Sequence, residues 1–196
     1  SQGGPPGKDW SSCPAQFCFF DCFSYSNDAS LLLPAPALTG NYRIIGYSGW
    51  ELANIGTTVS VTGTQDNTTV TVTLGSQASI VPGGGVSAAG PGQVVTFPLQ
   101  RGEVVQLYGP ASGDFSGSLV QADKPVQVIH GMPCTNVPDN VGYCDHIEES
   151  VFPAETLGRH YFVAAPTQPN GTPAPYVVRI HGNVDNTTLT YPGGAP

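Results

Sequence analysis

The sequence predicts an all-β fold: a β-sandwich-like module built from about ten short antiparallel strands. The composition is the first reason, because 25 glycines and 19 prolines in 196 residues favour many turns over long helices. The second is the low charge of 10% together with a single Met, since few of the strong helix formers are present. The third is a series of short apolar runs that end at turn residues.

Alternation of polar and apolar residues marks the clearest strands. In residues 58–62 and 69–74, threonine or serine alternates with valine or leucine, which is the period of two expected for a half-buried strand. The other predicted strands are runs of the same length. The full predicted set is Tyr42–Tyr47, Thr57–Thr62, Thr68–Leu74, Val94–Pro98, Val104–Tyr108, Gly117–Gln121, Val126–His130, Tyr161–Ala165, Tyr176–His181 and Thr187–Tyr191.

An internal repeat divides the chain. Shifted by 119 residues, Pro34–Thr71 aligns with Pro153–Thr190 without a gap, and 11 of the 38 pairs are identical. Chance would give about two identities at average residue usage. We therefore expect a Cys- and Phe-rich N-terminal arm at residues 1–33, a first β module at residues 34–152, and the start of an incomplete second copy at residues 153–196, packed on the first.

Each copy of the repeat contains the sequence Gly-x-x-Asp-Asn-Thr-Thr. Asp66 and Asn67, with their counterparts Asp185 and Asn186, are predicted to form a structural turn within a hairpin, because both residue types accept turn conformations. Calcium binding is the alternative, but one Asp and one Asn fall short of six to eight oxygen ligands. The Asn-Thr-Thr triplets and Asn170-Gly-Thr also match the acceptor pattern for N-glycosylation.

Five cysteines suggest disulfide chemistry. Cys134 and Cys144 are predicted to pair across a nine-residue loop. Of Cys13, Cys18 and Cys22, two would pair with each other, or one or more would bond to another molecule. An odd count leaves one thiol free, bonded to another molecule, or paired with a cysteine outside this sequence.

The stretch from residue 130 to residue 153 concentrates candidate chemistry. His130, Cys134, Cys144 and His146 could form a tetrahedral zinc site, although the spacing matches no familiar zinc pattern. The favoured interpretation is a disulfide followed by at most one short helix near residues 145–152. Its N-cap would be Asp145, with Glu148 three residues later. Asp145, His146 and Glu149 would then serve as capping and packing residues.

Charge and motifs exclude several functions. A net charge of −8 with six basic residues disfavours nucleic-acid binding, and no apolar run reaches the roughly 18 residues of a membrane-spanning helix. The sequence has no nucleophile elbow, zinc-protease motif or phosphate-binding loop. We therefore predict no catalytic residues, no metal and no cofactor, and composition suits an exported protein.

The sequence also resembles a known family. The residues concerned are Gly117–Gly131, Cys134, the run Cys144-Asp-His-Ile-x-Glu149, Pro153, and Leu157-Gly158. In this order they are similar to the family named for the amino-terminal domain of the IgG Fc-binding mucus protein, which has many bacterial relatives. The resemblance implies an extracellular β module without assigned catalytic activity.

Together these observations predict a non-enzymatic extracellular or cell-surface module for binding or adhesion, part of a larger tandem-repeat protein. Its partner would be a protein or glycan on a surface, or another copy of itself. A structural subunit of a filament or surface layer is the first alternative, and a zinc-dependent hydrolase is the second.

Overall fold

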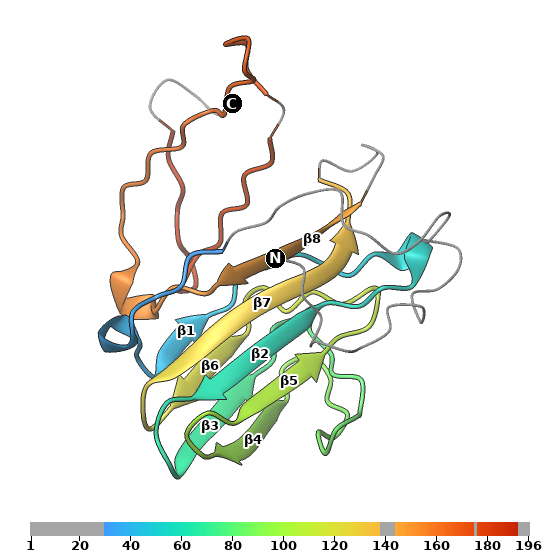
Figure 1. The fold of residues 1–196 in the computed structure, drawn as a ribbon, viewed down its shortest axis with the longest axis vertical. Helices are drawn as coiled ribbons and strands as arrows, with labels where there is room; N and C mark the ends of the chain where they lie inside the picture. Colours follow the sequence, from blue (N-terminus) through green and yellow to red (C-terminus); the bar gives the residue numbers. More distant parts are fainter. Residues whose placement is uncertain (1–29, 138–143, 175, 192–196) are drawn as a thin grey trace.

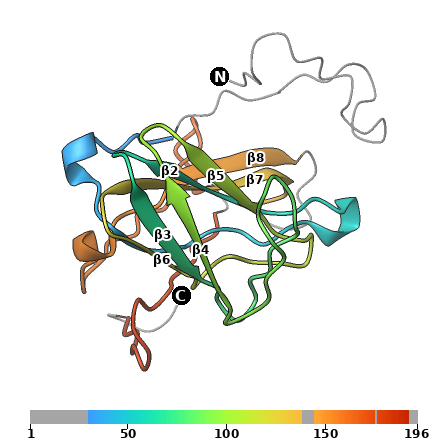
Figure 2. The ribbon, with the colours of Figure 1, turned by 90° about the horizontal axis from the view of Figure 1, so that it is seen from below.

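The computed structural model describes residues 30–137, 144–174 and 176–191, and these residues form two facing four-stranded antiparallel sheets (Figures 1 and 2). Within these ranges the only helical elements are single 3-10 turns, and no helix is long and apolar enough to cross a membrane. The all-β, sandwich-like prediction is confirmed. The 3-10 turns are η2 (Ala35–Ala37), η3 (Glu51–Ala53) and η4 (Ala154–Thr156).

The first sheet has the strand order β1-β6-β3-β4. Its edge strand β4 contains Pro98, which pairs in register with Thr69. Proline has no N–H to donate, so an edge strand is where a sheet tolerates it. The strands are β1 (Asn41–Arg43), β6 (Leu119–Ala122), β3 (Thr68–Thr73) and β4 (Val94–Leu99).

The second sheet has the order β5-β2-β7-β8. The long strand β7 pairs with β2 on one side and β8 on the other, and a register shift separates Met132 from Thr135 in the pairing with β8. Such an irregularity is common near the end of a sheet. The strands are β5 (Val104–Tyr108), β2 (Thr58–Gly63), β7 (Val126–Thr135) and β8 (Asp145–Ser150).

The core lies between the sheets, where the apolar half of each alternating strand is buried. Each fully buried valine or leucine contributes roughly 1.5–3 kcal/mol. Tyr42 is also completely buried, and its hydroxyl donates to the Val126 carbonyl at 2.5 Å, so its polar end is satisfied. Core residues from both sheets include Val59, Val61, Val70, Val72, Leu107, Phe115, Val120 and Val128.

The turn between β2 and β3 corrects the predicted hairpin. β2 pairs with β5 and β7, whereas β3 pairs with β4 and β6, so the two strands lie in opposite sheets. The segment at Asp66 and Asn67 is therefore a crossing from one sheet to the other. The period-two pattern located both strands correctly, but alternation alone does not identify the partner of a strand.

The predicted helix near residues 145–152 is wrong, because Asp145–Ser150 is strand β8. Asp145 consequently caps no helix, and Glu149 is an exposed strand residue opposite His130 in the register. The local Asp-x-x-Glu pattern suits a helix start, but pairing with β7 satisfies the same backbone groups over a longer segment. In the described part of the chain, the predicted strands at residues 161–165, 176–181 and 187–191 are not formed.

Candidate functional site

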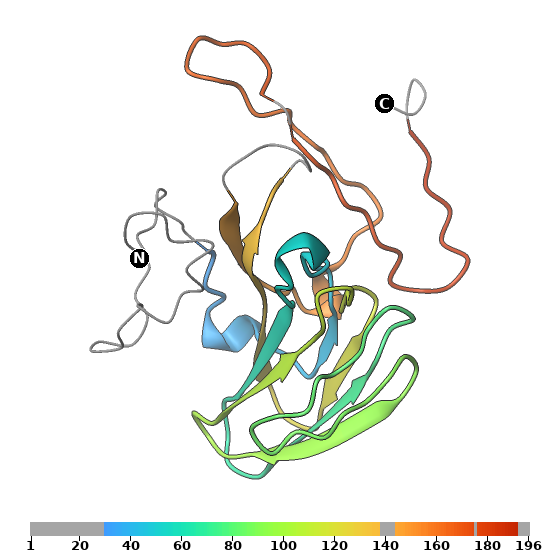
Figure 3. The same cartoon turned by 90° about the vertical axis from the view of Figure 1, so that its right-hand side faces the viewer.

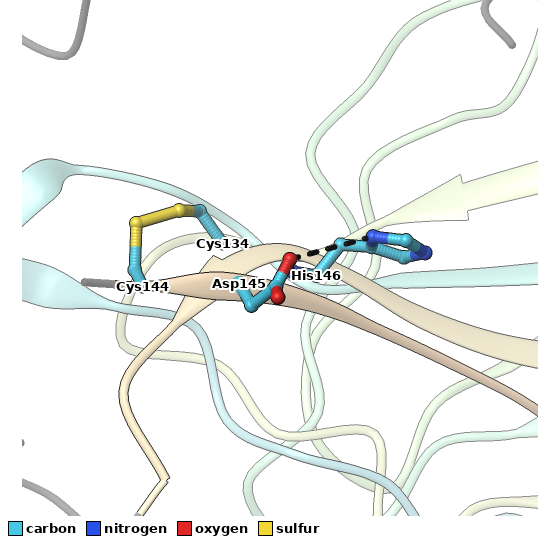
Figure 4. Close-up of a disulfide and its surroundings, with 4 residues drawn as sticks. All are labelled: Cys134, Cys144, Asp145 and His146. Atoms are coloured by element: carbon cyan, nitrogen blue, oxygen red, sulfur yellow. Dashed lines mark hydrogen bonds and ion pairs between the residues drawn. A yellow bond between two sulfur atoms is a disulfide. The ribbon is translucent and has the colours of Figure 1, made fainter. Parts of the chain in front are cut away.

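The Cys134–Cys144 disulfide joins the end of β7 to the residue before β8 (Figure 4). The two Cα atoms are 5.2 Å apart, and the predicted pairing is confirmed. Beside it, the Asp145 carboxylate accepts the backbone N–H of His146 at 2.9 Å, and His146 Nδ1 lies 3.8 Å from the same oxygen. The disulfide therefore links β7 to β8 at the end of the pair where the connecting loop lies.

The zinc arrangement is not formed by these residues. Cys134 and Cys144 are bonded to each other, so neither provides a thiolate ligand. His130 is buried in the sandwich with only 2% of its surface exposed, while His146 is on the surface side of β8. Over the described ranges, no group of three or more His, Cys, Asp or Glu side chains is arranged to hold a metal ion.

His130 instead forms a buried polar contact at the middle of β7. Its Nε2 lies 2.8 Å from the Thr57 hydroxyl and accepts the backbone N–H of Tyr47 at 3.3 Å. Burial lowers the pKa of His130 to about 4, with the nearby Asp114 carboxylate partly offsetting the effect. The imidazole is therefore neutral at pH 7, which is the form that can accept the Tyr47 N–H.

Next to His130, an arginine from the far end of the chain contacts the sandwich. Arg179 Nη2 donates to the Asp114 carboxylate at 2.8 Å, and Nη1 donates to the Gly46 carbonyl. The guanidinium carbon also lies 5.0 Å from the centroid of the Tyr47 ring, within cation–π range. We call Gly46, Tyr47, Asp114 and Arg179 the Arg179 cluster.

Asp114 holds its charge in this cluster. Burial alone would raise the pKa of its carboxyl, but hydrogen bonds from Ser116 and Arg179 outweigh burial and keep the pKa below its ordinary value. The Ser116 N–H donates to Oδ1 at 2.7 Å, while Arg179 binds Oδ2. Asp114 is thus the ionised partner of Arg179, and its side chain is only 10% exposed.

Thr57, His130 and Asp114 are the residue types of a nucleophilic triad, but their burial gives them a packing role. Thr57 is completely buried and His130 nearly so. A nucleophile must reach the substrate atom that it attacks. Both groups are enclosed in the core. The contacts of His130 with Thr57 and with the Tyr47 N–H therefore hold β7 against the segment around Tyr47.

Polar contacts at two further places connect residues 153–191 to the sandwich. Arg43 donates to the backbone carbonyl of Asn183 at 3.1 Å and to the Gly117 carbonyl at 2.8 Å. Near η4, the Glu155 carboxylate accepts from the Asn41 amide at 2.8 Å and the Thr39 hydroxyl at 3.0 Å. The C-terminal segment is therefore attached at three places, at Glu155, Arg179 and Asn183.

The two predicted turns have closely similar geometry. Asn67 and Asn186 both adopt left-handed backbone conformations, with φ of 55° and 60°. In the first turn the Asp66 carboxylate accepts the Arg101 N–H at 3.0 Å, and Lys124 donates to the Asp66 carbonyl at 2.5 Å. Its acidic oxygen is thus engaged by neighbouring backbone. The other predicted cysteines, Cys13, Cys18 and Cys22, lie outside the described residues.

The Arg179 cluster was missed by sequence reasoning because its four members come from three segments that are far apart in the sequence. One signal was available: Arg179 aligns with Ser60 in the repeat, so a charged residue replaces a small polar one in a run that otherwise keeps its apolar positions. Such a departure is consistent with a side chain that contacts another part of the chain.

These features define a class of protein: a disulfide-bonded, all-β module whose buried ionisable groups are used in packing. A family model described as IgGFc binding protein matches residues 28–196, and the chain belongs to this family. The IgGFc-binding protein of Homo sapiens is 30% identical over 167 residues, which is 85% of this chain but only 3% of the human protein. This relative gives no support to the expected bacterial relationship. No solved structure matches the chain.

Proposed function

We propose that this chain is a non-enzymatic extracellular module that binds a protein partner. The observation that carries the proposal is the family match over residues 28–196, because the family is described by binding rather than by a reaction. The Cys134–Cys144 disulfide supports an extracellular location, since such bonds persist in oxidising compartments. Burial of Thr57 and His130, the groups best suited to catalysis, supports a binding role.

The name of the human relative provides the first candidate ligand, the Fc region of IgG. The matched segment covers only 3% of that protein, so Fc binding by this chain is a proposal to be tested directly. Adhesion to a surface protein or glycan is the wider form of the same idea. A sandwich offers loops at both ends and two outer faces for such contacts.

The decisive experiment measures binding of the oxidised chain to immobilised Fc by biolayer interferometry, with Fab from the same antibody as the matched control. Saturable binding to Fc alone would support the proposal and identify the ligand. Equal binding to Fc and Fab would indicate non-specific adsorption. No binding to Fc would contradict the transfer of that ligand from the relative. A Cys134→Ser/Cys144→Ser variant tests whether binding requires the closed end of β7 and β8.

A structural subunit of a filament or surface layer is the second candidate. The observation favouring it is the distribution of exposed apolar side chains: ten of the twenty large ones in the described residues lie between Tyr161 and Tyr191. Large exposed apolar surface commonly marks an interface. Electron microscopy of concentrated protein would support this candidate if ordered assemblies form, and dispersed single particles would contradict it.

A further inference from the structure

The turn that joins β2 to β3 carries an Asn-Thr-Thr triplet, and the fold uses its first two residues. Asn67 adopts the left-handed conformation, with φ of 55°, and its N–H donates to Gln100 Oε1 at 3.1 Å. Thr68 is completely buried, and its hydroxyl donates to the Gln65 carbonyl at 2.7 Å. The turn therefore accounts for an asparagine at position 67 and a threonine at position 68.

Two polar groups of the triplet have no such use. The Thr69 side chain lies on the exposed face of β3, while its backbone N–H donates to Asp123 Oδ1 at 2.8 Å. The Asn67 amide turns its oxygen, Oδ1, toward the Gln100 amide at 3.5 Å. Among the described residues, neither the Thr69 hydroxyl nor the amide nitrogen Asn67 Nδ2 has a hydrogen-bond partner. Both groups are available at the surface.

The internal repeat keeps the same unexplained hydroxyl. Asp66–Thr69 and Asp185–Thr188 form the longest run of identical pairs between the two copies. In the first copy the Asp66 carboxylate accepts the Arg101 N–H, so this residue also has a role in the turn. A strand accepts any β-branched residue at position 69. The hydroxyl of the last threonine is therefore the part of the run that the fold does not explain.

The exposure of this turn is a property of the complete first module. Both flanking strands have two neighbours, since β2 lies between β5 and β7, and β3 between β4 and β6. Gly63 pairs with Val126 at the start of β7, so the turn lies at the opposite end of β7 from Cys134. In Figures 1 and 3 the turn is at the bottom, whereas residues 161–191 extend from the upper part. The second copy therefore neither covers nor exposes it.

We propose that Asn67 is a modification site that carries an N-linked glycan. An exposed asparagine followed two residues later by a threonine hydroxyl is the acceptor for this modification. The co-reactant is an oligosaccharide carried on a lipid diphosphate. Asn67 Nδ2 forms a bond to the anomeric carbon of the sugar, the bond from that carbon to the diphosphate oxygen breaks, the lipid diphosphate leaves, and Nδ2 releases one proton.

The turn accommodates this linkage without losing a contact. The modified side chain keeps Oδ1 as the acceptor that faces Gln100, and the Asn67 backbone N–H keeps its bond to the same residue. The sugar extends from Nδ2, which is the unused side of the amide. This modification requires the extracellular location in the proposed function, but it does not require the protein ligand.

The test uses the chain secreted from mammalian cells behind an added signal sequence. Peptide N-glycosidase in water enriched in the heavy oxygen isotope converts a glycosylated asparagine to a labelled aspartate, which mass spectrometry locates. We expect the label at Asn67. Thr69→Val keeps the side-chain shape and should abolish the label, while Thr69→Ser keeps the hydroxyl and should retain it. Thr71→Val, on the same face of β3, is the matched control and should also retain the label.

A second variant separates the glycan from the turn. Asn67→Asp keeps a residue type that adopts the left-handed conformation but has no Nδ2, so it should lose the glycan and still fold, as thermal denaturation would show. An unlabelled Asn67 in the secreted parent chain would overturn the proposal and leave the protein-binding proposal untouched. So would a label that persists in Thr69→Val, because the triplet would then not be the acceptor. Failure to bind Fc by a glycosylated chain would count against the ligand alone.

Discussion

Arg179 and Asp114 form a 2.8 Å ion pair between residues 65 positions apart, and this pair anchors an otherwise exposed segment to the β-sandwich. The Asp114 side chain is 10% exposed and that of Arg179 is 29% exposed. The pair is thus intermediate between a surface salt bridge, which contributes little, and a buried one, whose disruption is costly.

Replacing Arg179 with Met should release this segment. The substitution keeps the apolar stem but removes the donors to Asp114 and Gly46, so we expect a loss of about 1–2 kcal/mol in the free energy of unfolding. Urea denaturation measures the loss, and limited proteolysis should cleave near residues 176–183 faster. Arg159→Met, a change to an exposed arginine in the same segment, is the control. Equal effects from the two variants would show that the ion pair has no specific role.

Stability should fall in mild acid because of His130. Its pKa of about 4 in the folded state is below the ordinary value of 6.5, so the unfolded chain takes up the proton first. The stability is fully present above about pH 6.5 and declines by about 3 kcal/mol as the pH falls to about 4. Urea denaturation across this range should show the slope, and His130→Gln should flatten it. An unchanged slope in His130→Gln would assign the effect to other groups.

Asp114 should act in a lower pH window. Its folded-state pKa is depressed, so its contribution is present above its ordinary pKa and is lost as the pH falls through the folded value. Protonation removes the charge that binds Arg179. We therefore expect a second decrease in stability in acid below the His130 window, absent in Asp114→Asn. If Asp114→Asn behaves as the unmodified chain at low pH, the ion pair does not control this step.

Removing the Cys134–Cys144 disulfide should cost about 2–3 kcal/mol, as closing a loop of this size does in the chain-entropy model. The double variant Cys134→Ser/Cys144→Ser avoids leaving a free thiol in the loop. Thermal denaturation should show the lowered stability, and hydrogen exchange should show early opening of β8 at Asp145–Ile147. Because β8 is an edge strand, the β5–β2 pairing should keep its protection. Uniform loss of protection would contradict this local role.

Gly46 should not tolerate a side chain. A Cβ at this position would lie 2.3 Å from the His130 ring, which is itself held by Thr57 and Tyr47. We expect Gly46→Ala to reduce the free energy of unfolding by about 1–3 kcal/mol through overpacking. Gly83→Ala is the matched control, because a Cβ there has no neighbour within 4 Å. Denaturation midpoints of the two variants test the difference, and equal midpoints would show that the His130 ring can move.

The sequence predicted where strands lie and which of their faces are buried better than it predicted which strands pair. Alternation in β2 and β3 reflects burial of one strand face, which is a local property, so both strands were found with little error. The sheet to which each strand belongs depends on distant partners such as Val126–Thr135, and no local pattern carries that information. Assigning β2 and β3 to one hairpin failed for this reason.

The candidate site shows the same limit. The disulfide was predictable from two nearby cysteines, yet the following strand was mistaken for a helix because Asp145 and Glu148 match a capping pattern. The disulfide itself indicated a strand after Cys144, because it places residue 145 beside the end of β7. Asp114 and Tyr47 carry no local motif, and their role follows from a tertiary contact with Arg179.

The strand order also has a consequence for folding kinetics. β1 pairs with β6, where Asn41 lies opposite Gln121, and β2 pairs with β7, so both strands must pair with strands that are distant in the sequence. Such non-local pairing slows folding and lengthens the time for which strands are unpaired. Because residues 177–182 and 187–191 have the apolar pattern of β2 and β3, we expect them to compete with those strands for β5, β6 and β7 during that time. Such competition would slow folding, and we expect the side chains in which the second copy differs from the first, Arg179 among them, to weaken it.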